Sequence, residues 1–457
     1  MSESRVLILF LVLVELAIPR SEAGWCPDAG SGVSTGDSPF VLQVCDMNND
    51  GLADLITANA DSDSVSVVLG LDTSTFAPPV VFATGDEPVD LICCDVNADG
   101  FPDIVTVNHT SDDARVHLND GLARFESPGT SYPVGEAPWG IRCLHLDSDD
   151  RVDLVTANYT GDSVSVLRNR GKGLFHPRVD YSTENGTFAV AAADVDGDED
   201  VVTSNLLSGD VTVFRNLRDG TLTKIDSYPL GDRVFPWGLD GCDLNSDHAA
   251  DLVVAASDRV VVLFNEGGGA YGQPVYYSSA GNPYKLDCAD IDMDGHPDVV
   301  VADLGLDGLQ VFLNSGQGSL EPSVFLSLNA NPGSVVGEDL DSDGDRDLAA
   351  CSTVGAVVFE NFCGVVCGNG IVETGEECDN GGTFDDSACA EDCRVPRRAD
   401  YDGDGDVDMA DFSALQECFG IAPLPLRCFA LDSDGDGGLD LTDFGTFETG
   451  LLGPLFP

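Results

Sequence analysis

The sequence predicts an all-β fold, a seven-bladed β-propeller, followed by a small disulfide-rich segment and a small α-helical module. Three observations support this prediction. Fifty-one glycines and many short apolar runs favour short strands joined by turns over long amphipathic helices. One pattern recurs seven times, at intervals of 47 to 50 residues. Each copy divides into four apolar segments, and four strands in a repeat of about 40 to 50 residues are typical of a propeller blade.

The first 23 residues have the pattern of a secretory signal peptide. Arg5 gives a positive start, residues 6–18 are apolar apart from Glu15, and Ser21-Glu22-Ala23 offers a small-x-small cleavage site. An apolar stretch of about 13 residues is too short to span a bilayer, and no later stretch is long enough, so we expect no membrane span. We therefore expect a secreted protein, extracellular or at the cell surface. The 15 cysteines fit an oxidising compartment.

The charge of the chain excludes one class of partner. With 21 basic and 80 acidic residues, the formal net charge is −59. A nucleic-acid-binding protein needs a basic stripe, so we expect no nucleic-acid partner. Because 43% of the residues are hydrophobic, the chain can still bury a core, and its acidity reflects a scarcity of Lys and Arg.

The repeat places the blades in residues 31–361. It consists of an apolar strand, the motif D-x-[DN]-x-D-G-x-x-D, a second apolar strand and then V-x-V-[LF]-x-N. In the second copy the four predicted strands are 89–94, 103–108, 114–119 and 131–134. The motif copies begin at Asp46, Asp95, His145, Asp194, Asp243, Asp290 and Asp339.

The last copy lacks a fourth strand, because its pattern stops at residue 361. Residues 31–36 precede the first copy and have no blade of their own, so we expect this N-terminal segment to complete blade 7. Cys26 lies just before that segment and Cys363 just after its expected neighbour. A Cys26–Cys363 disulfide would then close the ring.

The nine-residue motif predicts a metal site. Carboxylates at positions 1, 3 and 5 of a tight turn point towards one centre, glycine at position 6 permits the turn, and Asp at position 9 closes the cage with the carbonyl of position 7. Without a cation these charges would repel one another, which disfavours a merely solvated acidic turn. Hard oxygen ligands in this number suit Ca²⁺, the cofactor that we expect.

The copies differ in completeness. Loops 1, 2, 6 and 7 are complete, and loop 5 lacks only the glycine, which is replaced by His248. Loop 3 has His145 at position 1 and Asp150 at position 6, and loop 4 is two residues short, so in these two we expect weak calcium binding or none. The predicted ligands are Asp46, Asn48, Asp50 and Asp54; Asp95, Asn97, Asp99 and Asp103; Asp243, Asn245, Asp247 and Asp251; Asp290, Asp292, Asp294 and Asp298; and Asp339, Asp341, Asp343 and Asp347.

On these seven in-phase motifs, residues 31–361 resemble the FG-GAP or VCBS-type repeats of integrin alpha subunits and many secreted bacterial proteins. The resemblance implies a propeller with calcium in the loop between the first two strands of a blade. The Phe-Gly and Gly-Ala-Pro signatures of the family survive only in fragments such as Glu136-Ala137-Pro138.

Aromatic residues recur where the chain enters the inner strand of a blade, and we expect them to rim the central channel opposite the calcium loops. In integrin alpha subunits a similar cage receives a basic side chain from the partner, so the resemblance implies a site for Lys or Arg of a protein; a glycan ring is another ligand that could stack there. The alternative is that the rings wedge the blades together as core. The residues are Phe40, Trp139, Phe188, Trp237 and Tyr284, with Val89 and Gly333 in the other two blades.

Seven cysteines, an odd number, lie within the propeller repeats: 45, 93, 94, 143, 242, 288 and 351. At least one of them is therefore expected to be unpaired within the repeats, as a buried thiol.

Residues 363–393 form the disulfide-rich segment, which contains CGNGIVETGEECDNGG and resembles a short cysteine-rich repeat of secreted bacterial proteins. A segment this short cannot build its own core, so we expect disulfides to hold it, with the connectivity open. A zinc site is the less favoured alternative, because no histidine lies nearby.

Residues 398–450 contain two loops of the EF-hand type, 32 residues apart, each followed by apolar residues at helical spacing. The pair resembles a type I dockerin, which implies two more calcium sites and a cohesin-like partner. Cys418 and Cys428 between the loops are expected to form a disulfide. The predicted calcium ligands are Asp400, Asp402, Asp404, Asp408 and Asp411, and Asp432, Asp434, Asp436, Asp440 and Asp443.

The sequence favours a calcium-binding, non-catalytic binding or adhesion protein that uses the propeller for recognition and the C-terminal module for attachment. No zinc-protease motif or phosphate-binding glycine loop occurs, and the six histidines have no metal-ligand spacing. The alternative is an accessory protein or glycoside hydrolase of extracellular polysaccharide degradation, which the dockerin resemblance implies.

Overall fold

In the computed structural model, the described residues are 30–361 except 72–74, 196, 280 and 329. The predicted signal peptide, the Cys26–Cys363 disulfide, the segment 363–393 and the module 398–450 with Cys418 and Cys428 lie outside these residues. Among the described residues no helix has the length and apolar character that a bilayer crossing requires.

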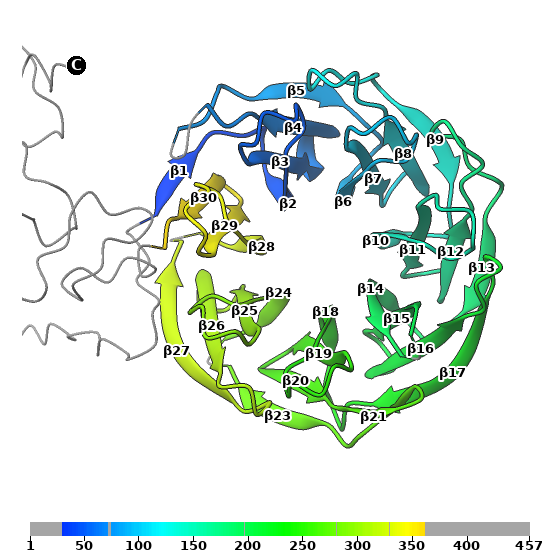
Figure 1. The fold of residues 1–457 in the computed structure, drawn as a ribbon, viewed down its shortest axis with the longest axis vertical. Coiled ribbons are helices and arrows are strands. Elements are labelled where there is room, and N and C mark those ends of the chain that lie inside the picture. The colour runs from blue at the N-terminus through cyan, green and yellow to red at the C-terminus, as the bar shows by residue number, and fades with distance from the viewer. Residues whose placement is uncertain (1–29, 72–74, 196, 280, 329, 362–457) are drawn as a thin grey trace, which may run out of the picture. The chain divides into compact units, whose positions relative to one another are not determined.

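Seven four-stranded antiparallel sheets surround a central axis, which confirms the predicted seven-bladed propeller (Figure 1). Blade 1 contains β2 (Pro39–Cys45), β3 (Asp54–Asn59), β4 (Ser64–Val68) and β5 (Val80–Ala83). Blade 2 contains β6 (Pro88–Cys94), β7 (Asp103–Asn108), β8 (Asp113–His117) and β9 (Thr130–Pro133). Blade 3 contains β10 (Pro138–Leu144), β11 (Asp153–Asn158), β12 (Ser163–Leu167) and β13 (Val179–Ser182).

The remaining blades follow the same order. Blade 4 contains β14 (Thr187–Asp194), β15 (Glu199–Asn205), β16 (Asp210–Asn216) and β17 (Leu222–Pro229). Blade 5 contains β18 (Pro236–Cys242), β19 (Asp251–Ala256), β20 (Arg259–Leu263) and β23 (Val275–Ser278), with a hairpin of β21 (Asn265–Gly267) and β22 (Ala270–Tyr271). Blade 6 contains β24 (Pro283–Ala289), β25 (Asp298–Asp303), β26 (Gly308–Asn314) and β27 (Leu320–Ser327). Blade 7 contains β28 (Pro332–Glu338), β29 (Asp347–Ser352) and β30 (Gly355–Phe359).

The fourth strand of blade 7 is β1 (Ser31–Val33), from the N-terminal end of the described chain. It pairs antiparallel with β30, with Ser31 opposite Val358 and Val33 opposite Ala356. The two strands lie side by side although they come from opposite ends of the propeller sequence (Figure 1). The ring is therefore closed by backbone hydrogen bonds where the sequence predicts closure.

The core lies between the blades. The second strand of each blade is buried along its length, as in β3, except at the exposed Glu199 that begins β15. Each sheet packs against a neighbouring blade on both of its faces, so both faces need apolar side chains. One core cluster joins Val41, Ile56 and Val65 of blade 1 to Leu91 and Ile104 of blade 2. The outer strands, such as β5, are largely exposed. The only helix in the described residues is a 3₁₀ turn, η1 (Ala60–Ser62).

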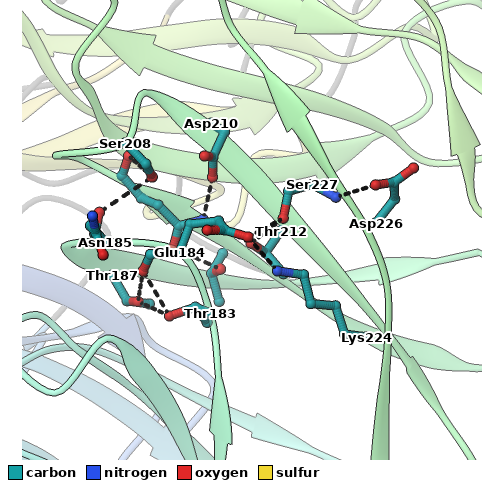
Figure 2. Close-up of polar contacts among 12 residues, drawn as sticks. Thr183, Glu184, Asn185, Thr187, Ser208, Asp210, Thr212, Lys224, Asp226 and Ser227 are labelled. Carbon is teal, nitrogen blue, oxygen red and sulfur yellow. Dashed lines mark hydrogen bonds and ion pairs between the residues drawn. The ribbon is translucent and has the colours of Figure 1, made fainter.

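Blade 4 shows how polar side chains tie the outer edge of a blade to the preceding loop (Figure 2). Lys224 Nζ on β17 lies 2.7 Å from Glu184 Oε1 in the loop before β14. Asn205 Nδ2 donates to Asp210 Oδ1 at 2.7 Å and to Thr212 Oγ1 at 2.8 Å. The ion pair connects β17 to the loop that leads the chain towards the channel, and the Asn205 bonds connect β15 to β16.

Candidate functional site

Each predicted calcium loop joins the first and second strands of a blade, so the loops all lie at one end of the inner strands. In loop 1, Asp46 Oδ1 accepts the backbone N–H of Asp50 at 3.1 Å, and Asp46 Oδ2 accepts that of Gly51 at 2.9 Å. Asp50 Oδ1 accepts the N–H of Leu52 at 2.9 Å. Hydrogen bonds within the turn therefore hold the carboxylates of positions 1 and 5.

The glycine at position 6 adopts a positive φ, 86° at Gly51 and 90° at Gly100 and Gly295. A Cβ atom at these positions would meet nothing within 4 Å, so the backbone angle, not space, requires glycine. In loop 5, His248 holds the same conformation with φ 69°. The turn of loop 5 is therefore kept despite its unfavourable residue, and His248 N donates to Asp243 Oδ2 at 2.8 Å as Gly51 does to Asp46.

The aspartate at position 9 is buried in every blade and has a structural role. Asp54 accepts the N–H of Met47 at position 2 and the N–H of Gly70 beyond the third strand, both at 2.8 Å. The second of these bonds recurs in all seven blades. The equivalent residues are Asp103, Asp153, Asp200, Asp251, Asp298 and Asp347.

Burial is the main cause of the electrostatic shifts at position 9. It raises the pKa of Asp54 to about 6, while the two backbone donors oppose the shift and the charges of Asp50 and Asp46 add to it. The pKa of Asp298 rises to about 7 for the same first reason. The raised pKa values show that the negative charge of Asp54 and Asp298 is costly in the cation-free loops.

An asparagine after the third strand links most loops to the next blade. Asn119 Nδ2 in blade 2 donates to Met47 O in loop 1 at 2.7 Å and to Pro102 O at 2.9 Å. Asn169 makes the equivalent bond to Val96 O of loop 2 at 2.8 Å. Asn314 and Asn361 do the same with loops 5 and 6. The geometry of a loop is therefore coupled to the packing of neighbouring blades.

The loop oxygens fit a cation. Ligand atoms of Asp290, Asp292 and Asp294 lie within 4.8 Å of one another, as do those of Asp339, Asp341 and Asp347. Oδ1 of Asp290 and Oδ1 of Asp339 are buried without a hydrogen-bond partner. Asn97 Oδ1 in loop 2 is in the same situation. Buried oxygens without donors are the groups that a Ca²⁺ ion would satisfy.

In loops 3 and 4 a carboxylate pairs with an arginine, which belongs to loop 3 itself in one case and comes from another turn in the case of loop 4. In loop 3, Arg151 forms an ion pair with Asp149. In loop 4, Arg218 forms an ion pair with Asp198. His145 at position 1 of loop 3 lies beside Glu199 of the next blade, with Nδ1 3.4 Å from Oε2. Sequence reasoning identified these loops as incomplete but missed the arginines.

The five predicted aromatic residues come together at the other end of the inner strands. The ring centroids of Trp139 and Phe188 are 4.9 Å apart, those of Phe188 and Trp237 5.1 Å, and those of Trp237 and Tyr284 5.6 Å. Phe40 completes the cluster, 5.8 Å from Trp139 and 6.0 Å from Tyr284. The rings therefore contact one another across the axis instead of standing apart around an open rim.

Burial differs within this aromatic cluster. Phe188 and Tyr284 are buried, whereas Phe40, Trp139 and Trp237 are half-buried. Phe40 of blade 1 and Tyr284 of blade 6 are in contact although blade 7 lies between them in the ring. The blade 7 position is Gly333, where a Cβ atom would lie 2.1 Å from Phe40 O, so only glycine allows this close approach. Tryptophan and phenylalanine faces thus remain partly accessible to solvent at this end of the channel.

Charged side chains lie just behind the aromatic cluster. Asp90 from blade 2 contacts Lys285 Nζ from blade 6 at 3.1 Å and lies 3.7 Å from Arg142 Nη1 of blade 3. With Trp139 and Phe188 these residues line a chamber of about 40 Å³, the size of one or two water molecules. Sequence reasoning did not find this group, because no motif marks it.

Disulfides link the inner strands of neighbouring blades. The pairs are Cys45–Cys93, Cys94–Cys143 and Cys242–Cys288, with Cα atoms 6.4 to 6.6 Å apart. Each pair joins the last residue of the inner strand of one blade to the next-to-last residue of the inner strand of the following blade. Cys351 is buried and free, as the odd count of cysteines requires.

The geometry defines a β-propeller with acidic turns at one end of its channel and an aromatic cluster at the other. The model of the FG-GAP-like repeat family matches residues 46–106, 145–201, 196–254, 243–301 and 290–350. The chain belongs to this family of FG-GAP-like repeat proteins.

Solved structures show the same architecture at low sequence identity. A complex of BBS1N with ARL6DN is similar with a TM-score of 0.52 and 15% identity, covering 74% of this chain and 96% of that chain. Virginiamycin B lyase from Staphylococcus aureus has a TM-score of 0.52 and 10% identity, covering 72% and 98%. Among curated proteins, none matches this chain. Because one similar structure is a binding complex and the other a lyase, these likenesses concern the fold alone.

Proposed function

We propose that this protein is a secreted, calcium-stabilised, non-catalytic scaffold for binding or adhesion. The observation that carries the proposal is the convergence of carboxylate oxygens in the complete loops 6 and 7, where Asp290 and Asp339 also have a buried oxygen without a partner. Asp153 and Asp198 have such an oxygen too, but they lie in loops 3 and 4, whose ligand sets are incomplete. The residues that would hold Ca²⁺ are those at positions 1, 3, 5 and 9 of loops 1, 2, 5, 6 and 7. Membership of the FG-GAP-like repeat family supports a binding scaffold.

Calcium would supply positive charge where the fold concentrates carboxylates. Its contribution would extend beyond the turn, because the position 9 carboxylate also accepts the N–H of the residue after the third strand. That residue, Asn119 in blade 2, binds the neighbouring loop through Met47 O. A bound ion would therefore stabilise the contact between two blades as well as one loop.

Recognition is proposed at the aromatic cluster. The half-buried faces of Phe40, Trp139 and Trp237 offer a stacking surface, and Asp86 and Glu87 lie on a loop at the same end of blade 2. A cationic side chain of a protein partner suits aromatic faces near acidic groups, and a sugar ring suits the same faces without a charge requirement. Attachment through a cohesin-like partner is proposed from the C-terminal sequence alone.

The calcium proposal is tested by measuring bound metal per chain after dialysis against micromolar Ca²⁺, using the full-length secreted protein. We expect Asp99→Asn in loop 2 to lose about one ion per chain, because position 5 provides a ligand and lies exposed on the turn. The matched control is Asp120→Asn on a neighbouring turn of blade 2, outside the motif, for which we expect no loss. Equal metal content in Asp99→Asn and the parent protein would contradict the proposal.

The recognition proposal is tested with Trp139→Ala and Trp237→Ala, using arrays of glycans and of basic and neutral peptides as probes. We expect both variants to lose the parent's binding signal while chemical denaturation reports folded protein. Reduced stability with unchanged binding would instead make the cluster purely a core element. Release of reducing sugar from plant or algal polymers would support the alternative function in polysaccharide degradation.

A further inference from the structure

We infer that guanidinium groups of the chain itself neutralise the loops of blades 3 and 4, so that these two loops take no calcium and metal binding in the propeller is confined to the other five. The inference rests on the proposed function, since it concerns which of the seven loops bind the ion. It assigns a specific role to Arg151 and Arg218, which no motif of the repeat includes.

Loop 3 has lost its first ligand and gained an internal cation. The backbone N–H of His145 donates to Glu199 Oε2 at 2.6 Å, and its ring nitrogen Nδ1 lies 3.4 Å from the same oxygen. The position 1 side chain is thus engaged with blade 4. At position 5, Asp149 pairs with Arg151, which occupies position 7 of the same loop. The carboxylate that a complete loop would direct at calcium is already paired.

In loop 4 the carboxylate is also paired with a guanidinium group, but the arginine belongs to another turn. Arg218 comes from the turn between β16 and β17, and its guanidinium pairs with Asp198 and donates from Nη2 to Gly197 O at 2.9 Å. The other oxygen of Asp198 is buried without a hydrogen-bond partner. A calcium ion at that oxygen would lie close to the guanidinium, and the two positive charges would repel. The arginine therefore excludes the ion while compensating the carboxylate.

The two loops are also joined to each other. Asp147 of loop 3 forms a backbone bridge with Asp219, in the turn that carries Arg218. Ser148 Oγ donates to Arg218 O at 3.3 Å. Loop 3 thus contacts the turn that carries Arg218, the residue that pairs with loop 4. Loops 3 and 4 are therefore connected through this turn.

The distribution of basic residues is an independent observation that favours the same inference. Blades 3 and 4, residues 138–235, hold ten of the 15 Lys and Arg in residues 30–361. Blade 1, whose loop is complete, holds none. The ten residues are Arg142, Arg151, Arg168, Arg170, Lys172, Arg178, Arg215, Arg218, Lys224 and Arg233. Positive charge thus concentrates in the blades whose loops lack a complete ligand set.

The test compares bound calcium per chain in the full-length protein and in three single variants. We expect Asp149→Asn and Asp198→Asn to keep the parent's calcium content and Asp99→Asn to lose about one ion. Loss of an ion in Asp149→Asn or Asp198→Asn would overturn the inference. If Asp99→Asn also keeps the parent's content, the calcium proposal itself fails, so the two failures are distinguishable.

A second variant tests the inference by a gain. His145→Asp combined with Asp150→Gly and Arg151→Leu gives loop 3 the pattern D-L-D-S-D-G-L-V-D, which matches the complete loops. We expect this variant to bind about one additional ion per chain. A folded variant that binds no additional ion would show that the guanidinium is not what excludes calcium from loop 3. Unfolding in denaturant, monitored with excess Ca²⁺, establishes that the variant is folded.

Discussion

Lys285 Nζ lies 3.1 Å from Asp90 Oδ1, although the two residues are 195 positions apart and belong to blades 6 and 2. Both side chains are largely buried in the channel, and the second oxygen of Asp90 accepts the N–H of Ile141 at 3.1 Å. One ion pair therefore connects three blades around the axis.

Replacing Lys285 by Met should destabilise the propeller by roughly 3 kcal/mol, because it leaves the buried carboxylate of Asp90 with only the longer ion pair to Arg142, at 3.7 Å. Urea unfolding in the presence of Ca²⁺ measures the effect. The matched control is Lys224→Met, which breaks an ion pair with Glu184 near the surface (Figure 2) and should cost less than about 1 kcal/mol. Equal losses in the two variants would contradict a special role for the cross-channel pair.

Positions 5 and 9 of a calcium loop should behave differently when the metal is removed. The Asp103 carboxylate accepts the backbone N–H groups of Val96 and Asn119, and the amide of Asp103→Asn can accept only one of them well. We therefore expect this variant to lose about 1 to 3 kcal/mol of folding stability, even when a chelator has removed the calcium. Asp99→Asn should reduce stability only when Ca²⁺ is present. Thermal unfolding with Ca²⁺ and with chelator separates the two effects. A chelator-independent loss in Asp99→Asn would argue against a ligand role for position 5.

His117 should make the stability of blade 2 depend on pH. Its ring is fully buried, Nδ1 donates to Glu126 O at 3.0 Å, and Nε2 accepts from Thr84 Oγ1 at 2.9 Å. Burial lowers the pKa of His117 to about 4. Since the unfolded chain takes up its proton near pH 6.5, the folded state loses up to about 3 kcal/mol of stability as pH falls from about 6.5 to 4.

His117→Gln should remove that loss, so the stability difference between parent and variant should shrink as pH falls. Urea midpoints from pH 7.5 to 4 measure the difference. His176→Gln is the matched control, since it removes an exposed histidine without opening the core. Parallel pH profiles for the parent and His117→Gln would refute the prediction.

The Cys45–Cys93 disulfide should stabilise the interface between blades 1 and 2. Cross-linking residues 48 positions apart restricts the unfolded chain by roughly 4 kcal/mol in the chain-entropy model. The Cys45→Ser/Cys93→Ser variant should therefore unfold at lower urea concentration. In a strong reductant the parent and the variant should unfold alike, and a persistent difference there would assign the loss to packing and not to the bond.

The sequence predicts the number of blades and the register of their strands because the repeat is strict. In blade 2 it places the second strand at 103–108, the bounds of β7. It errs by one or two residues in the third strand, where β8 is Asp113–His117, because the apolar pattern continues into the turn. Repeat alignment also contains the signal for the disulfides, since the paired cysteines occupy neighbouring positions in consecutive inner strands.

Contacts between side chains from distant repeats have no comparable signal. Asp90 and Lys285 meet only because the ring brings blades 2 and 6 to one axis, and neither residue stands in the motif. The same holds for Arg218, whose partner Asp198 lies 20 residues away on another turn. The aromatic positions could be predicted from the repeat, but the mutual contact between their rings depends on side chains from distant blades and on the small Gly333.

Closure of the ring by β1 and β30 has a consequence for how the molecule is made. β1, the strand that completes blade 7, is synthesised before the other propeller strands, and its partner β30 follows only after more than 300 further residues. Until then the nascent chain carries an unpaired edge, which is a hazard for association with other chains. A polypeptide truncated before residue 355 would keep that edge permanently, so the ring can close only after β30 has been synthesised.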